Sequence, residues 1–235
     1  MKNNFLTICT AIVITGTFLT SCKKNSSSPA ATSSSQMTFG VRAASTLDTI
    51  PASTATINWT AGTANISGFK FEARKHGLAI EVVSRNMTNV DLFALNPSLV
   101  GITLDTGTYN EIEIMVDLSR SSTTDLPLVL KGTFTNTAGT AVPVEFDFND
   151  NAEIKAEAKN VDVDGTTDLT TIIAMHLNKL LANVTATELG NATLTNGTIV
   201  ISRTSNTHIY DQIKGDLSLC GFWNGFERHG KGGDH

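Results

Sequence analysis

The sequence of 235 residues is poor in charged and aromatic side chains, and both shortages exclude functions. Charged residues make up 17% of the chain and aromatic residues 6%, with two tryptophans and two tyrosines. Nucleic-acid binding depends on clustered Lys and Arg, whereas the cations here are scattered and the formal net charge is -5. The sequence therefore predicts no nucleic-acid partner. Glycan-binding β domains usually present exposed aromatic rings.

Trp223 is the candidate for such a ring, because it lies beside Phe222 near the end of the chain. The alternative for Trp223 is packing of the terminal segment onto the domain. Trp59 lies in an alternating run with Ile57, so we expect it in the core.

Catalytic motifs are missing as well. The chain contains no G-x-S-x-G, H-E-x-x-H, C-x-x-C or G-x-G-x-x-G pattern and no phosphate-binding loop. None of its five histidines is spaced as a helical metal pair, although His229, Asp234 and His235 could bind copper or zinc in a terminal tail. We therefore predict that the protein is not an enzyme, with a metal-handling accessory protein of the periplasm as one alternative.

The chain also lacks an apolar run long enough to span a bilayer, which takes about twenty residues. Its longest apolar segment, 5–18, follows Lys2 and ends at Leu19-Thr20-Ser21-Cys22. This arrangement is typical of a signal peptide, and the last four residues resemble the lipobox of bacterial, Bacteroidota-type lipoproteins. The resemblance implies acylation of Cys22 and anchoring to the outer membrane. An ordinary secretory signal and a short membrane anchor are the alternatives.

Four segments follow from this interpretation: a signal peptide at 1–21, an acylated Cys22 with a Ser-rich tether at 22–36, a folded domain at 37–222 and a disordered tail at 223–235. Cys9 would leave with the signal, so Cys220 has no partner for an intramolecular disulfide. Because Cys220 lies among apolar residues, we expect it to be a small buried side chain.

Apolar residues alternate with polar ones along most of the remaining chain. Ile112, Ile114, Val116 and Leu118 alternate with Glu111, Glu113, Met115 and Asp117, and turn residues such as Ala61-Gly62-Thr63 separate the runs. Short strands at this spacing predict an all-β fold, a two-layer antiparallel β-sandwich. Short helical segments are expected only near the C-terminus, among them 206–219 with Asn206 as its cap.

Three stretches resemble a domain of unknown function that is common in such lipoproteins: 90–95 (VDLFAL), 106–114 (TGTYNEIEI) and 144–148 (VEFDF). The resemblance covers roughly residues 37–165 and implies an exported β-sandwich without an established activity. In this setting Tyr109 is expected to close one end of the sandwich with its hydroxyl in water.

The nearest approach to a metal motif is a set of oxygen-bearing residues with the spacing of a calcium loop. They are Asn160, Asp162, Asp164 and Asp168, with Gly165 at the sharp turn. Thr171 occupies the position of the bidentate Glu, and a polar turn explains the same pattern. Calcium is therefore a possible ligand and no other cofactor is predicted.

Taken as a whole, the sequence predicts a lipid-anchored envelope protein with a non-catalytic binding, adhesion or structural role. Its partner would be an envelope protein that pairs with an exposed strand edge. The alternative is a ligand-binding module for a glycan or calcium. Both the periplasmic and the outer face of the membrane remain open as locations.

Overall fold

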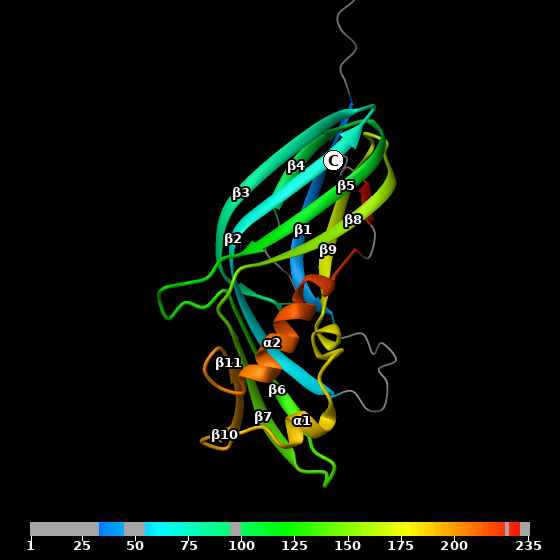
Figure 1. The fold of residues 1–235 in the computed structure, drawn as a ribbon. Coiled ribbons are helices and arrows are strands. Elements are labelled where there is room, and N and C mark those ends of the chain that lie inside the picture. Colours follow the sequence, from blue (N-terminus) through cyan, green and yellow to red (C-terminus); the bar gives the residue numbers. More distant parts are fainter. Residues whose placement is uncertain (1–32, 45–54, 95–99, 224–225, 231–235) are drawn as a thin grey trace, which may run out of the picture. The chain divides into compact units, whose positions relative to one another are not determined.

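The structure is a computed structural model that describes residues 33–44, 55–94, 100–223 and 226–230 (Figure 1). The predicted signal peptide at 1–21, the lipidation site Cys22, and Asp234 and His235 all lie outside the described residues. The predicted tether reaches to residue 36, but strand β1 already begins at Ser34. Its backbone pairs with β4, and Ser35 is fully buried, so the last tether residues belong to the fold.

Two β-sheets make up the described domain. The smaller sheet has the strand order β4-β1-β9-β12, with β13 also paired to β9. Its strands are β1 (Ser34–Ala44), β4 (Val100–Asp105), β9 (Thr167–His176), β12 (Gly221–Trp223) and β13 (Glu227–Gly230). Strands β1 and β9 run parallel.

The larger sheet has eight strands in the order β10-β11-β7-β6-β2-β5-β8, with β3 paired to β2. Its strands are β2 (Ile57–Lys75), β3 (Leu78–Asp91), β5 (Gly107–Leu118), β6 (Leu128–Thr135), β7 (Ala141–Phe148), β8 (Ala152–Val163), β10 (Leu194–Thr195) and β11 (Thr198–Ser202). Strand β2 is long enough for two neighbours in succession on one side. Residues 57–64 pair with β6, residues 68–74 pair with β5, and β3 occupies the opposite side.

This arrangement divides the larger sheet into two halves. The sandwich half contains β3, β5, β8 and the second part of β2, and it faces the smaller sheet. Phe39 of β1 stacks on Phe69 and Phe71 of β2, with ring centroids 4.7 and 5.5 Å apart. Because side chains alternate along a strand, the inner residues of β5 are buried while their neighbours remain partly accessible. Apolar side chains of both sheets therefore form one core.

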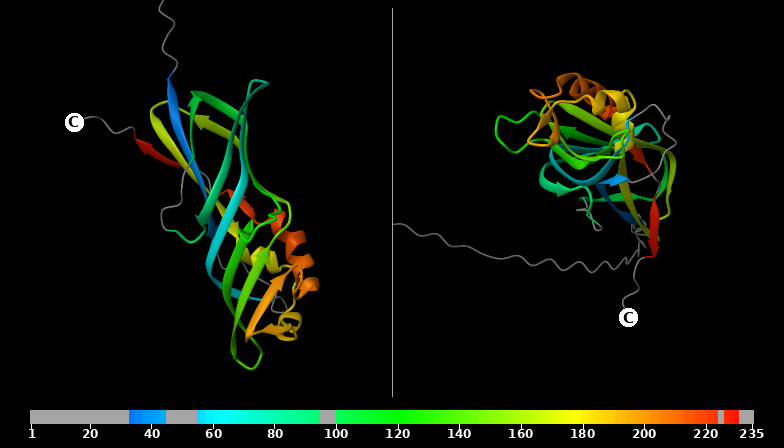
Figure 2. Two further views of the ribbon diagram at one scale, coloured as in Figure 1. Left: turned by 90° about the vertical axis from the view of Figure 1, so that its left-hand side faces the viewer. Right: turned by 90° about the horizontal axis from the view of Figure 1, so that it is seen from below.

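The helix half contains β6, β7, β10, β11 and the first part of β2. Helical segments cover it (Figures 1 and 2). Tyr210 of α2 packs against Phe146 and Phe148 of β7, at ring distances of 5.9 and 6.2 Å. The segments are η1 (Leu177–Leu181), α1 (Ala186–Gly190), α2 (Thr207–Asp216) and η2 (Leu217–Leu219).

The all-β prediction with two sheets and short helices near the C-terminus is confirmed. Two pairs, β1 with β9 and β7 with β11, are parallel, which the antiparallel prediction did not include. The turn predicted at Ala61-Gly62-Thr63 is wrong, because these residues continue β2 and pair with β6. Gly62 packs closely there: a Cβ atom would lie 2.7 Å from a methyl group of Leu130, which would have to move.

Three further predictions need correction. Glu227–Gly230 forms β13 on β9, so this part of the predicted disordered tail is a strand. Asn206 does precede α2, but its side chain bonds to Thr193 and the carbonyl of Val200 instead of capping the helix. The Tyr109 hydroxyl is buried rather than wet, and it donates to the carbonyl of Asp105 (3.0 Å).

Candidate binding surface

Strand β3 is one of the two outer strands of the sandwich half, β8 being the other, and it lies beside β2 (Figure 1). Among the described strands it pairs only with β2, which leaves the backbone groups along its other side without a strand partner. Leu78 and Val83 are 75% and 52% exposed, unusually high values for apolar residues of a strand. An unpaired edge with apolar side chains is a template for another strand.

The solvent face next to this edge consists of rows of charged residues that run across four strands. One row contains four glutamates, because Glu72 of β2 lies opposite Glu81 of β3 and Glu113 of β5, which in turn lies opposite Glu157 of β8. Like charges directly opposite one another destabilise a sheet unless cations intervene.

Lysine side chains two residues before or after the glutamates of β2 and β8 offset the repulsion between the carboxylates. Lys70 contacts Glu72 and Glu81 at 3.4 and 3.5 Å. Lys155 pairs with Glu113, and Lys159 lies 3.0 Å from Glu157. The hydrogen bond from Lys159 lowers the pKa of Glu157 below its usual range. The acidic row is therefore part of a neutralised network.

Glu111, Glu113 and Glu157 come close enough together to hold a metal ion. Each of them is already paired with a cation, however: Arg74 contacts Glu111 at 3.2 Å, and Lys155 and Lys159 serve the other two. A metal ion would have to displace these partners, so ion pairing across the sheet is sufficient to explain the cluster.

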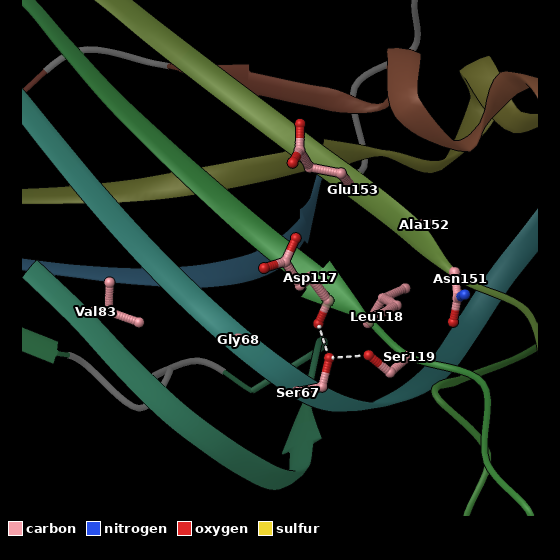
Figure 3. A pocket seen from close by; sticks show the side chains of 9 residues that line it. All are labelled: Ser67, Gly68, Val83, Asp117, Leu118, Ser119, Asn151, Ala152 and Glu153. Carbon is pink, nitrogen blue, oxygen red and sulfur yellow. Dashed lines mark hydrogen bonds between the residues drawn. The ribbon is translucent and has the colours of Figure 1, made fainter.

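A shallow hollow of about 590 Å³ opens on the same face, where β2, β5 and β8 meet (Figure 3). Asp117 and Glu153 lie directly opposite each other on β5 and β8. Gly68 leaves room for them, since a Cβ atom at this position would lie 2.7 Å from a carboxylate oxygen of Asp117. Ser67 Oγ donates to the carbonyl of Asp117 (3.0 Å) and lies 2.7 Å from Ser119 Oγ.

Val83 of the exposed edge also lines this hollow, so the edge and the hollow form one continuous surface. We call it the β3 surface: Val83, Ser67, Asp117 and Glu153. Leu78 begins the same edge strand, but its side chain projects from the opposite face of the sheet to that of Val83. Its carboxylates and hydroxyls can accept hydrogen bonds from a polar partner, while the β3 backbone can pair with a strand. The sequence predicted a strand at 78–85 but contains no signal that this strand lies at an edge.

The predicted calcium loop does not gather its ligands around one point. Asp162 accepts a hydrogen bond from Thr108 Oγ1 (2.6 Å), and Asp168 accepts one from the backbone N–H of Gln36 (3.0 Å). These carboxylates, together with Asp164, do not form a group close enough to hold a metal ion. Asn160 is exposed and has a left-handed backbone conformation.

Asp164 instead closes the turn between β8 and β9. Its carboxylate accepts from the backbone N–H groups of Thr166 and Thr167 (2.8 and 2.9 Å) and contacts Arg228 of β13 (3.3 Å). These backbone hydrogen bonds hold the pKa of Asp164 far below its usual range. The polar-turn alternative accounts for the residues that suggested calcium.

The other residues singled out in the sequence are two tryptophans, a histidine and a cysteine. The backbone of Trp223, in β12, pairs with that of Ile173 in β9. The side chains of Trp223 and His229 lie outside the described part of the structure. Trp59 lies in the core as predicted, with 9% exposure. Cys220 is fully buried, and burial raises the pKa of its thiol to about 12, which makes it unreactive.

Sequence reasoning missed a polar centre at Asp150 that joins β7 to α2. Asp150 accepts hydrogen bonds from Tyr210, Lys214 and Arg203 at 3.0, 3.0 and 2.8 Å. Partial burial alone would raise the pKa of Asp150, but the hydrogen bonds from Lys214 and Tyr210 lower it. These partners lie more than fifty positions away in the sequence, so local patterns give no sign of them.

No helix in the described ranges has both the length and the apolar character needed to cross a bilayer. Comparisons of the chain with protein-family models, with curated proteins and with solved structures found no match. The geometry of the surface is therefore the basis for a functional assignment.

Proposed function

We propose that the protein is a lipid-anchored, non-catalytic component of the bacterial cell envelope that binds a partner protein by strand addition at β3. The observation that carries this proposal is the unpaired β3 edge with its exposed Leu78 and Val83. The lipobox-like sequence ending at Cys22 supports the anchor. A lipid anchor with more than one acyl chain gives stable membrane attachment.

The chemistry of the β3 surface favours a strand over a small molecule. Backbone N–H and C=O groups on the free edge provide affinity in strand addition, and alternating side chains provide specificity. Val83 offers an apolar contact and the nearby Asp117 and Glu153 offer negative charge. The matching partner is an extended segment of an envelope protein with apolar residues and Lys or Arg in alternation.

The test is photo-crosslinking on intact cells that produce the full-length protein. A photoreactive residue at Leu78 should capture one defined protein, whereas the same residue at Leu219 in η2, which is 61% exposed and lies outside any strand, should not. The additional substitution Val83→Lys should abolish capture at Leu78, because it places a charge on the edge. Equal crosslinking from Leu78 and Leu219, or capture that survives Val83→Lys, would contradict strand addition at β3.

The anchor is tested separately by metabolic labelling with a fatty-acid analogue. Wild-type protein should incorporate the label and begin at Cys22 after processing, and Cys22→Ala should do neither. Cys220→Ala is the matched control, since this buried thiol should not affect labelling. Equal labelling of Cys22→Ala would rule out the lipid anchor and leave the β3 surface unaffected.

A further inference from the structure

A second cavity lies apart from the β3 surface, at the junction of the two sheets. It has a volume of about 210 Å³, and we call it the Trp59 cavity. Its wall comes from the end of β1, the start of β2, the chain after β3 and the start of η1. The lining residues are Ala43, Ala44, Thr56, Ile57, Asn58, Trp59, Phe93, Leu177 and Asn178.

Backbone hydrogen bonds fix the elements around this cavity. The N–H of Ala43 donates to the carbonyl of Leu92 (2.7 Å), which ties the end of β1 to the segment that carries Phe93. The N–H of Ala55 donates to the carbonyl of Val184 (2.8 Å), which ties the approach to β2 to the chain after η1. The wall is therefore held by main-chain contacts and does not depend on mobile side chains alone.

The lining has the composition of a small-molecule site. Most of the wall is apolar, none of the nine lining residues is charged, and Thr56, Asn58 and Asn178 supply a few polar groups. An apolar cavity of about 150 Å³ is large enough to bind benzene, so this volume accommodates a ring with one substituent. A charged ligand is disfavoured because no lining residue could compensate its desolvation.

A second observation also points to a ligand. Trp59 is 9% exposed, and its indole Nε1 is buried without a hydrogen-bond partner in the described part of the protein. A buried donor without a partner destabilises the folded protein, because it has lost its hydrogen bond to water. Because Trp59 is one of the lining residues, a ligand with a hydrogen-bond acceptor can pair with this donor.

We infer that the Trp59 cavity binds a small uncharged molecule with an apolar body and one hydrogen-bonding group, of the size of a monosubstituted benzene. This function is independent of the partner binding proposed for β3. It requires no covalent chemistry, and it assigns to Trp59 a place in the wall of a ligand site as well as in the core.

The test uses two molecules of nearly identical shape, the neutral benzamide and the anionic benzoate, with full-length protein carrying Trp223→Phe. This background leaves Trp59 as the only tryptophan. Its indole resonance in a ¹H–¹⁵N spectrum should shift saturably with benzamide, with a dissociation constant on the order of 1 mM, as suits so small a ligand. Benzoate should bind at least tenfold more weakly.

Cavity-filling variants complete the experiment. Ala43→Leu and Ala44→Leu should each weaken benzamide binding at least tenfold, and unfolding curves identify any variant that fails to fold. Ala79→Leu adds the same atoms to the exposed face of β3 and should leave binding unchanged. The inference is overturned if benzamide does not shift the Trp59 resonance, if benzoate binds equally well, or if a folded cavity-filling variant binds like the parent.

Discussion

The two halves of the larger sheet are covered in different ways. The sandwich half packs against a second sheet through large apolar rings, with Phe39 against Phe69 and Phe71, and its outer strand β3 stays unpaired. The helix half is covered by short helices that pack through Tyr210 on Phe146 and Phe148 and are also held by hydrogen bonds, such as that of Tyr210 to Asp150. Burial of apolar side chains therefore stabilises both halves, and in the helix half polar contacts are added to it.

This difference also explains where the candidate surface lies. A sheet covered by another sheet retains its edges and one wet face, on which charge rows and a hollow can form. In the helix half, α2 is tied to β7 through Asp150, and α1 begins with a capping box between Thr185 and Glu188. Partner binding is consequently proposed for the sandwich half.

The largest expected effect tests the dependence of the sandwich half on apolar packing. Phe71 is fully buried and stacks on Phe39, so Phe71→Ala should lower the free energy of unfolding by about 3–5 kcal/mol. Urea unfolding measures it, with the exposed Val83→Ala as the matched control, which should cost less than about 0.5 kcal/mol. A loss below about 1 kcal/mol at Phe71 would show that the stacked rings are not the main contact between the sheets.

The second prediction compares one hydroxyl in each half. Tyr210 donates to Asp150 and accepts from the N–H of Asn149 (3.2 Å), whereas Tyr109 makes one hydrogen bond, to Asp105. Tyr210→Phe should therefore cost about 1–2 kcal/mol, because it leaves a backbone donor without its partner. Tyr109→Phe should cost about 1 kcal/mol or less. Equal or reversed losses in urea unfolding would contradict the stronger polar dependence of the helix half.

The strands could be predicted from the sequence wherever buried apolar residues alternate with their neighbours over many positions. Ile112, Ile114, Val116 and Leu118 identified β5, and each of these side chains is buried. Strand β4 was missed because Gly101 interrupts a short run, and β12 and β13 were missed because three or four residues form a strand only by pairing with β9. Strand β2 continues through Gly62, which looks like a turn residue in the sequence, because Gly62 and its neighbours pair with β6.

The candidate surface was less predictable than the fold. Polar and apolar alternation indicates that 78–85 is a strand, but not which neighbours it has. The glutamate row follows from the register of four strands, and Asp117 meets Glu153 only through the pairing of β5 with β8. In the calcium-like segment the spacing of the side chains was visible, but the partners of Asp164 and Asp168 belong to other parts of the chain.

The third prediction concerns pH and the Asp150 centre of the helix half. The folded protein lowers the pKa of Asp150 from its ordinary value of 3.8, so its contribution to stability is fully present above that value and is lost as the pH falls from there through the lowered pKa of the folded state. Asp150→Asn should cost roughly 1 kcal/mol at pH 7, and this difference should shrink toward pH 2. Urea unfolding from pH 7 to pH 2 measures it, and a difference that stays constant with pH would rule out the charge of Asp150 as its cause.

The smallest expected effect on stability concerns the β3 edge itself. Val83 is 52% exposed, so a lysine at this position can extend into water and should change the free energy of unfolding by less than about 0.5 kcal/mol. The same substitution should abolish crosslinking from Leu78, because charge on an edge strand opposes pairing with another strand. Val83→Thr keeps the β-branched shape without a charge and should retain crosslinking, which separates charge from shape. A Val83→Lys variant that unfolds far more easily would instead show that Val83 stabilises the sandwich half, and that the edge is not a free surface.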